Sequence, residues 1–206
     1  MLPSLLDVID TGEFEDNGSL YIEEASTHRD GLSIRLRLVL PDGDHTIRTI
    51  VCHQPRSHAL LAAVPCCDLS VVEDHVLLWP HSQSIRALYF NGRATDPRSL
   101  LGALVETHYR IVGEWIPFER FMNDALFSPA IDLLDSHSGL LAEGPDQLII
   151  AYSNVLTDLG IRHSSPPSRE PSWWDGTQWQ LETEKLYALI IGPSYVVAPA
   201  FSEKVA

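Results

Sequence analysis

LSIRLRLVLPDGDHTIRTIVCH, residues 32–53, is the stretch that decides the fold of this chain. Its first half places leucine or isoleucine at every second position, which is the period of a half-buried β-strand. PDGD at 41–44 has the composition of a tight turn, and residues 45–53 alternate again. The stretch therefore predicts an antiparallel hairpin with one apolar face.

The side chains of this hairpin divide between two faces. Five share the inner face of its first strand: Leu32, Ile34, Leu36, Leu38 and Leu40. Three are expected on the matching face of its second strand: Ile47, Thr49 and Val51. Three arginines are expected on the outer face: Arg35, Arg37 and Arg48. The hairpin therefore predicts a basic outer surface over an aliphatic core.

The three arginines require negative charge nearby. If Leu40 pairs with His45, Arg37 lies opposite Arg48, and like charges so placed are destabilising. An anionic ligand or partner over the arginines would offset this repulsion. The alternative is an internal partner, because Glu23 on the preceding strand reaches the hairpin in a plausible register. All three arginines are therefore candidate binding residues.

Two helices with strong apolar stripes follow the hairpin. A helix is expected over 97–112, because Thr95 or Asp96 can cap its start and Gly113 suits its end. A second helix is expected over 145–159, where leucine, isoleucine, valine and tyrosine recur on one side. These are the two main helices of the predicted fold.

Weaker patterns complete the predicted order of elements. They indicate short helices at 3–9, 55–64 and 117–123, strands at 20–25, 69–79 and 85–90, and a closing hairpin over 186–201. The Pro/Ser-rich run 162–172 has no apolar side chain besides its three prolines and predicts an exposed, mobile loop. The predicted class is α+β: a mostly antiparallel sheet, with an N-terminal meander and a C-terminal hairpin, packed against the two helices. A single domain over 1–206 is favoured, and a split near 124–145 is the alternative.

Composition limits the class of protein. With 45% hydrophobic and 20% charged residues the chain is globular in type, and no apolar run approaches the roughly 20 residues that span a membrane. Asp and Glu outnumber Lys and Arg by 28 to 14, so the charge of −14 disfavours nucleic acid and favours a basic protein partner. Three cysteines without a framework spacing fit a reducing compartment, so we expect a cytoplasmic protein.

The common signatures of catalysis are absent from the sequence. It contains no GxxxxGK[ST], GxGxxG, HExxH, GxSxG or Cys-x-x-Cys motif. The sequence therefore favours a protein that is not an enzyme, and we expect no cofactor.

Cysteines and histidines between positions 52 and 81 are the basis of a metal hypothesis. They are Cys52, His53, His58, Cys66, Cys67, His75 and His81. Thiolates and imidazoles suit Zn²⁺, but the spacing matches no zinc motif, and adjacent cysteines can seldom both bind one ion. Buried packing is the favoured interpretation, and a catalytic thiolate at Cys66 or Cys67 is a further alternative.

His108 lies on the apolar stripe of the 97–112 helix, one turn after Leu104. A histidine there is most often a core residue, and the alternative is a general base or a ligand contact. Aromatic residues surround it in sequence: Trp79, Tyr89, Phe90, Tyr109, Trp115, Phe118, Phe121 and Phe127. The aromatic region 79–127 therefore predicts either the main core, which we favour, or a small-molecule pocket.

WWDGTQW at 173–179 is the candidate for an exposed interface. Tryptophan is enriched at interfaces, whereas Asp-Gly at 175–176 also predicts a hairpin turn that folds the rings onto a sheet. Trp173, Trp174 and Trp179 are therefore candidate binding residues. An exposed patch of this kind would also serve a homodimer.

Three functional hypotheses follow. The first is a non-catalytic, acidic protein-binding module of the adaptor, inhibitor or chaperone type. The second is a small-molecule-binding protein or enzyme that uses the aromatic region 79–127 with His108. The third is a metal-binding protein that uses the cysteine and histidine residues of 52–81.

Overall fold

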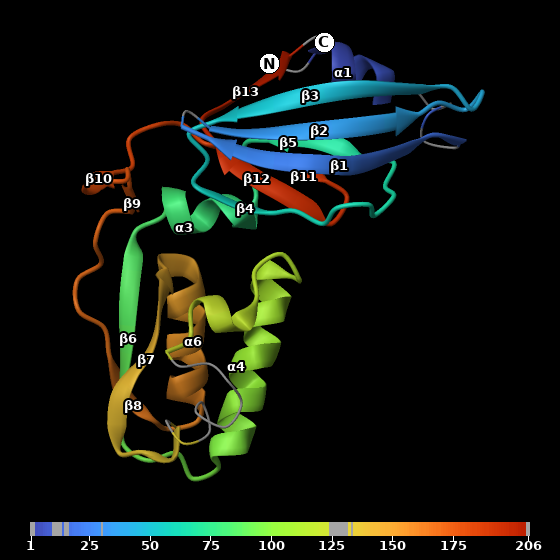
Figure 1. The fold of residues 1–206 in the computed structure, drawn as a ribbon. Helices are drawn as coiled ribbons and strands as arrows, with labels where there is room; N and C mark the ends of the chain where they lie inside the picture. The colour runs from blue at the N-terminus through green and yellow to red at the C-terminus, as the bar shows by residue number, and fades with distance from the viewer. Residues whose placement is uncertain are drawn as a thin grey trace. The chain divides into compact units, whose positions relative to one another are not determined.

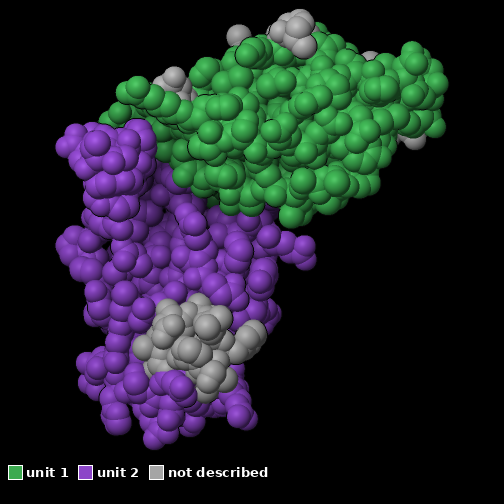
Figure 2. All heavy atoms as spheres, in the orientation of Figure 1, with its two compact units in different colours: residues 1–78, 183–206 green, residues 79–182 purple. Residues whose placement is uncertain are grey.

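The computed structural model describes residues 3–9, 14, 17–29, 31–123, 132 and 134–204. It combines helices with antiparallel sheets, which confirms the α+β class (Figure 1). The chain forms two compact units: unit 1 is Met1–Leu78 with Thr183–Ala206, and unit 2 is Trp79–Glu182 (Figure 2). The boundaries between these units lie outside 124–145. A single domain over 1–206 stays a prediction, because compactness does not say whether either unit folds alone.

Unit 1 contains two four-stranded antiparallel sheets among its described residues. Its elements are α1 (Pro3–Ile9), β1 (Ser19–His28), β2 (Gly31–Val39), β3 (His45–His53), β4 (Ser57–Ala59), β5 (Leu69–Val72), the 3₁₀ helix η1 (Val76–Leu78), β11 (Tyr187–Ile191), β12 (Ser194–Ala198) and β13 (Ala200–Lys204). One sheet has the order β1-β2-β3-β13 and the other β4-β12-β11-β5. The C-terminal strand β13 therefore completes the sheet of the N-terminal meander, as Figure 1 shows beside β3.

The core of unit 1 lies between the apolar faces of these two sheets. The alternating leucines of β2 are buried, and they belong to one cluster with residues of β11 and β12 such as Leu189 and Val196. Leu36 and Leu38 are fully inaccessible to solvent. Burying each such side chain stabilises the fold by about 1.5–3 kcal/mol. The period of two in β2 therefore predicts its buried face correctly.

The register between β2 and β3 differs from the expected one. Val39 lies opposite His45, in the place that the alternation assigns to Leu40. The reason lies in the turn: the Leu40 amide donates to the Asp44 carbonyl at 2.7 Å, and the Gly43 amide donates to the Leu40 carbonyl at 2.9 Å. Leu40 therefore belongs to the turn and not to the strand.

This slip of one residue exchanges the faces of β3, because successive side chains point to opposite sides of a strand. Ile50 and Cys52 face the core and are fully buried. The predicted inner set lies on the other face: Ile47, Thr49 and Val51. Arg37 lies opposite Ile47, so the predicted pairing of Arg37 with Arg48 is wrong.

Unit 2 is built on a three-stranded antiparallel sheet with the order β7-β6-β8. Its elements are α3 (Trp79–Ser82), β6 (Ile85–Asn91), α4 (Pro97–Val112), the 3₁₀ helix η2 (Phe118–Arg120), β7 (Ser138–Pro145), α6 (Asp146–Asp158), β8 (Arg162–Ser164), β9 (Ser172–Trp174) and β10 (Trp179–Leu181). Helix α6 packs on β6 and β7, and α4 packs on α6. None of the described helices is long and apolar enough to cross a membrane.

The two main helices are where their local signals predict them. The carboxylate of Asp96 caps α4 by accepting hydrogen bonds from the amides of Arg98 and Ser99. Gly113 ends α4 with a φ of 61°, a conformation that costs other residues energy. Helix α6 begins directly after β7 and buries Ile149 and Tyr152 on the side that the apolar pattern predicts.

Several weaker predictions are wrong. Residues 55–64 contain the strand β4, which pairs with β12, and not a helix. The strand expected over 69–79 ends at Val72, and β7 does not occur in the predicted order of elements. In each case pairing with a distant strand overrides a weak local preference.

The segment 162–172 is tied to the sheet of unit 2. Its first residues form β8, which pairs with β6, and Arg169 forms an isolated bridge with Ile85. Most side chains of the segment are exposed, as predicted. Its mobility stays a prediction.

Candidate functional site

The tryptophan-rich turn forms a two-stranded hairpin in unit 2. Strands β9 and β10 pair in antiparallel register, with Trp174 opposite Trp179. Because side chains alternate along a strand, Trp174, Trp179 and Leu181 lie on the same face. Trp173 lies opposite Gln180 and belongs to the other face. The Asp-Gly pair therefore predicts the hairpin correctly.

One face of this hairpin exposes an unusual amount of apolar surface. The exposed fractions are 53% for Trp174, 69% for Trp179 and 64% for Leu181. The two indoles meet edge to face, with ring centroids 5.9 Å apart. Exposed aromatic side chains gathered in this way are typical of interaction surfaces. Trp173 is half-buried.

The turn of the hairpin is held by the carboxylate of Asp175. Its Oδ1 accepts hydrogen bonds from the amides of Thr177 and Gln178 at 2.7 and 2.8 Å, and its Oδ2 accepts one from Gln180 Nε2 at 2.8 Å. These hydrogen bonds, that from Gln180 above all, hold the pKa of Asp175 far below its usual value. The turn therefore stays negatively charged over the working range of pH.

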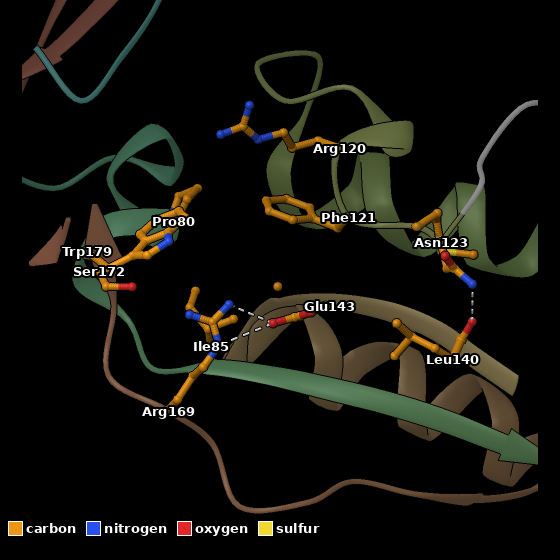
Figure 3. A pocket seen from close by; sticks show the side chains of 12 residues that line it. Pro80, Ile85, Arg120, Phe121, Asn123, Leu140, Glu143, Arg169, Ser172 and Trp179 are labelled. Atoms are coloured by element: carbon orange, nitrogen blue, oxygen red, sulfur yellow. Dashed lines mark hydrogen bonds and ion pairs between the residues drawn. The ribbon is translucent and has the colours of Figure 1, made fainter. Parts of the chain in front are cut away.

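A groove of about 420 Å³ lies beside the hairpin within unit 2 (Figure 3). Its lining residues are Pro80, Ile85, Arg120, Phe121, Met122, Asn123, Leu140, Glu143, Gly144, Arg169, Ser172 and Trp179. In Figure 3 the Trp179 indole lies beside Pro80 on one wall, and the Phe121 ring lies across the groove from them. The volume falls in the range of small-ligand sites.

The segment WIPFERFMN, residues 115–123, supplies one wall of this groove. It lies beside β7. Met122 forms an isolated bridge with Ala142, and the Asn123 amide donates to the Leu141 carbonyl at 2.9 Å. The Phe121 ring packs on the backbone at Gly144, where a Cβ would lie only 2.8 Å from the ring. This aromatic segment therefore contributes both to core packing and to a wall of the groove.

An ion pair closes the lower side of the groove. Arg169 Nη2 lies 2.7 Å from Glu143 Oε1, and Arg169 also pairs through its backbone with Ile85. Figure 3 shows the two charged groups facing each other below Phe121. The segment that precedes β9 is therefore anchored to both β6 and β7.

His108 is fully buried between helices, with both ring nitrogens bonded. Nε2 donates to the Ile116 carbonyl at 2.6 Å, so Nδ1 accepts from the Tyr152 hydroxyl at 2.8 Å. Burial lowers the pKa of His108 and raises the pKa of Tyr152. The histidine is therefore neutral and has the arrangement of a core residue, and it does not line the groove.

The arginines of the first hairpin have internal partners. Glu23 lies 3.3 Å from Arg35 and 3.0 Å from Arg37, which is the internal pairing that the sequence offers as the alternative to a ligand. Arg48 lies on the inner face of its sheet and pairs with Glu203 at 2.9 Å. The negative charge that these arginines require is thus supplied by the chain itself.

The cysteine and histidine residues of the metal hypothesis occupy different environments. Cys52 is buried in the core, Cys66 is half-buried with its thiol directed at the Leu20 carbonyl, and Cys67 is exposed. His53 shares a hydrogen bond of 2.8 Å with Ser202. Within the described part of the chain, no three His, Cys, Asp or Glu side chains gather as a metal site requires.

The residues at the groove include several that the sequence does not reveal as a group. Arg120 and Asn123 lie in the aromatic segment, where their polar character sets them apart. Glu143 and Arg169 are separated by 26 positions, and only the sheet brings them together. Two sequence candidates line the groove among the described residues: Trp179, and Phe121 of the aromatic region 79–127.

No protein-family model matches the chain, and no curated protein or solved structure shows significant similarity to it. The functional argument therefore depends on the geometry of the hairpin and the groove.

Proposed function

We propose that the protein is a non-catalytic protein-binding module that holds a basic segment of a partner on the β9–β10 hairpin. The observation that carries this proposal is the exposed pair of Trp174 and Trp179 on a turn that Asp175 makes rigid and negative. An adaptor, an inhibitor and a chaperone all use a surface of this kind.

The chemistry of the hairpin supports a basic partner. Indole faces attract arginine and lysine side chains, by about 0.5–1 kcal/mol at exposed sites and more when water is excluded. The run from Glu170 to Glu182 contains acidic residues and no lysine or arginine. The rings and the carboxylates of this run thus favour the same class of side chain.

The charge of the whole chain acts in the same direction. At −14 it attracts a basic protein at long range and speeds their encounter, an effect that salt screens. The aromatic contact acts only at short range. Salt should therefore change mainly the rate of association, and the tryptophans should change mainly the lifetime of the complex.

The test is capture of partners by the tagged protein at low and at high salt, with identification by mass spectrometry. Wild type and Ile150→Ala, which alters an exposed apolar residue elsewhere in unit 2, should retain the same basic protein. Trp174→Ala should lose it, and so should wild type at high salt. Equal recovery on Trp174→Ala would refute the proposal.

A further inference from the structure

The groove of unit 2 contains an arginine whose charge is not paired. Among the described residues, Arg86 is paired with Asp146, Arg93 with Asp135 and Arg169 with Glu143. No described carboxylate pairs with Arg120, which is exposed where it lines the groove. Figure 3 shows its guanidinium extended past Phe121 on the side of Pro80 and Trp179. Its guanidinium is therefore available to pair with an anion from outside the chain.

The groove is positive although the chain is strongly acidic. Among the described residues, Glu143 is the only acidic one that lines the groove, and the 2.7 Å contact with Arg169 neutralises that carboxylate. Arg120 then leaves one net positive charge. Because the field of the chain repels small anions, a local cation of this kind is needed before an anion can bind. The charge therefore selects a ligand that is negative.

The apolar walls select the rest of the ligand. The Trp179 indole and Pro80 form one wall and the Phe121 ring the other. Aromatic and proline surfaces so placed suit a flat apolar group, which stacks or packs edge to face. A volume of about 420 Å³ accommodates one such group with a short polar extension, and not a folded protein surface.

We propose that this groove binds a carboxylate that carries a flat apolar group, with Arg120 pairing with the carboxylate and Trp179 and Phe121 holding the apolar group. Such a ligand has two possible sources. It is a free aromatic acid, or it is the C-terminal residue of a peptide. Arginine pairs with a carboxylate through two parallel hydrogen bonds, and this geometry distinguishes a carboxylate from its neutral amide.

The experiment is a titration of the ¹⁵N-labelled full chain followed by NMR. The probes are phenylacetate, its neutral amide phenylacetamide, and a tripeptide ending in phenylalanine as the free acid and as the amide. The reporters are the indole N–H of Trp179 and the amides of Asn123 and Gly144. Arg120→Gln is the test variant, and Arg110→Gln, which alters an exposed arginine of α4 outside the groove, is the charge-matched control.

We expect at least one free acid to shift the reporters of wild type and of Arg110→Gln. Its amide and the Arg120→Gln variant should each bind about tenfold more weakly, since a charge-assisted pair is lost. Binding of phenylacetate identifies a small acid as sufficient, whereas binding of the peptide acid alone identifies a C-terminus.

Three results would overturn the proposal. They are equal affinity for acid and amide, equal affinity of Arg120→Gln and wild type, and no shift from any probe up to about 10 mM, where even millimolar binding is visible. Because Arg120 is exposed, its replacement leaves the fold intact. Gly144→Ala provides a second variant, which displaces the Phe121 ring and should weaken the acid without altering any charge. Binding of a basic partner to the hairpin is measured separately, so either proposal can fail without the other.

Discussion

The arginines of the first hairpin in unit 1 and Arg120 in unit 2 differ in their ionic partners. In unit 1 the arginines of β2 and β3 are each held by a carboxylate of a neighbouring strand, Glu23 or Glu203. In unit 2 no described carboxylate pairs with Arg120, which lines the groove together with Phe121 and Trp179. This difference is the reason why Arg120, and not an arginine of the first hairpin, belongs to the proposed anion site.

The units also differ in how they bury polar groups. Cys52 of unit 1 lies among aliphatic side chains, and burial is the cause of its raised pKa. His108 of unit 2 lies in an aromatic core and is hydrogen-bonded on both nitrogens. The buried histidine of unit 2 is therefore held by specific polar contacts, whereas the buried Cys52 of unit 1 is held by apolar packing.

The largest expected effect concerns the thiols of unit 1. Burial raises the pKa of Cys52 to about 12 and that of Cys66 to about 11. At pH 8 a rise of three units lowers the reactive thiolate about 1,000-fold, and burial slows access further. Native protein should therefore react with a thiol reagent first at the exposed Cys67, and Cys52 should react only on unfolding.

Mass spectrometry of the labelled peptides over time measures this order, and the unfolded chain is the control in which all three sites react alike. The pKa of the Cys52 thiol is higher in the folded state than in the unfolded state. Its contribution to stability is therefore fully present below about pH 9 and is lost as the pH rises further. Unit 1 of a Cys52→Ala variant should therefore lose less of its stability above that pH. Early labelling of Cys52 in native protein would contradict its place in the core.

The next largest effect is on the core of unit 2. His108→Ala removes a buried ring and leaves the Tyr152 hydroxyl and the Ile116 carbonyl unpaired, so unit 2 should lose about 3–4 kcal/mol of its free energy of unfolding. Urea unfolding measures the loss, and hydrogen exchange shows which unit it affects. Tyr109→Ala, which alters the exposed neighbour on the same helix, should cost less than about 1 kcal/mol. Equal costs would argue against the buried network.

A smaller effect is expected from the half-buried ion pair of unit 1. The side chain of Glu203 is only 7% exposed, so Arg48→Met leaves a carboxylate with little water to replace its partner. We expect a loss of about 1–2 kcal/mol, below the cost for a fully buried pair because Arg48 is itself 28% exposed. Urea unfolding at low and high salt tests this. A loss that disappears in salt would indicate a pair exposed to solvent.

The smallest effect is expected at the outer face of the same sheet. Arg35→Met removes an ion pair whose arginine is 52% exposed, and Glu23 keeps its contact with Arg37. The loss should be no more than about 0.5 kcal/mol, as for other surface pairs. The same unfolding series measures it beside Arg48→Met. A larger loss would show that the outer face contributes to stability as the inner face does.

Local signals account for the elements that the sequence predicts correctly. The carboxylate of Asp96, the glycine at 113 and the spacing of leucines act within one or two helical turns, so α4 can be predicted without knowledge of the rest. The hairpin of β9 and β10 follows in the same way from Asp175 and Gly176. The strand β4 could not be predicted, because its three residues are a strand only through pairing with β12.

The residues of the candidate site also differ in whether local sequence features can predict them. The exposed tryptophans were predicted as binding candidates, since their type and turn are local features. A small-molecule pocket in the aromatic region 79–127 is one of the two interpretations that the sequence offers, and Phe121 of that region lines the groove. The polar residues of the groove are not predicted, because Arg120, Glu143 and Arg169 come from three segments that meet only when β6, β7 and the residues before β9 pair. His108 is a candidate because of its residue type. Its neutral state, with both ring nitrogens hydrogen-bonded, depends on Tyr152, which lies 44 positions away in the sequence.

Local patterns in the sequence predict the α+β class, the two main helices with their ends, the alternating face of β2 and the tryptophan hairpin. The register of β3, the pairing of β13 with β3, the internal partners of the arginines and the convergence of residues on the groove are established only when the chain folds. The two sets differ in the separation along the chain over which the responsible interactions act. Propensity, capping and turn chemistry act over a few residues, whereas register and ion pairing depend on which distant strands come together and which face they bury.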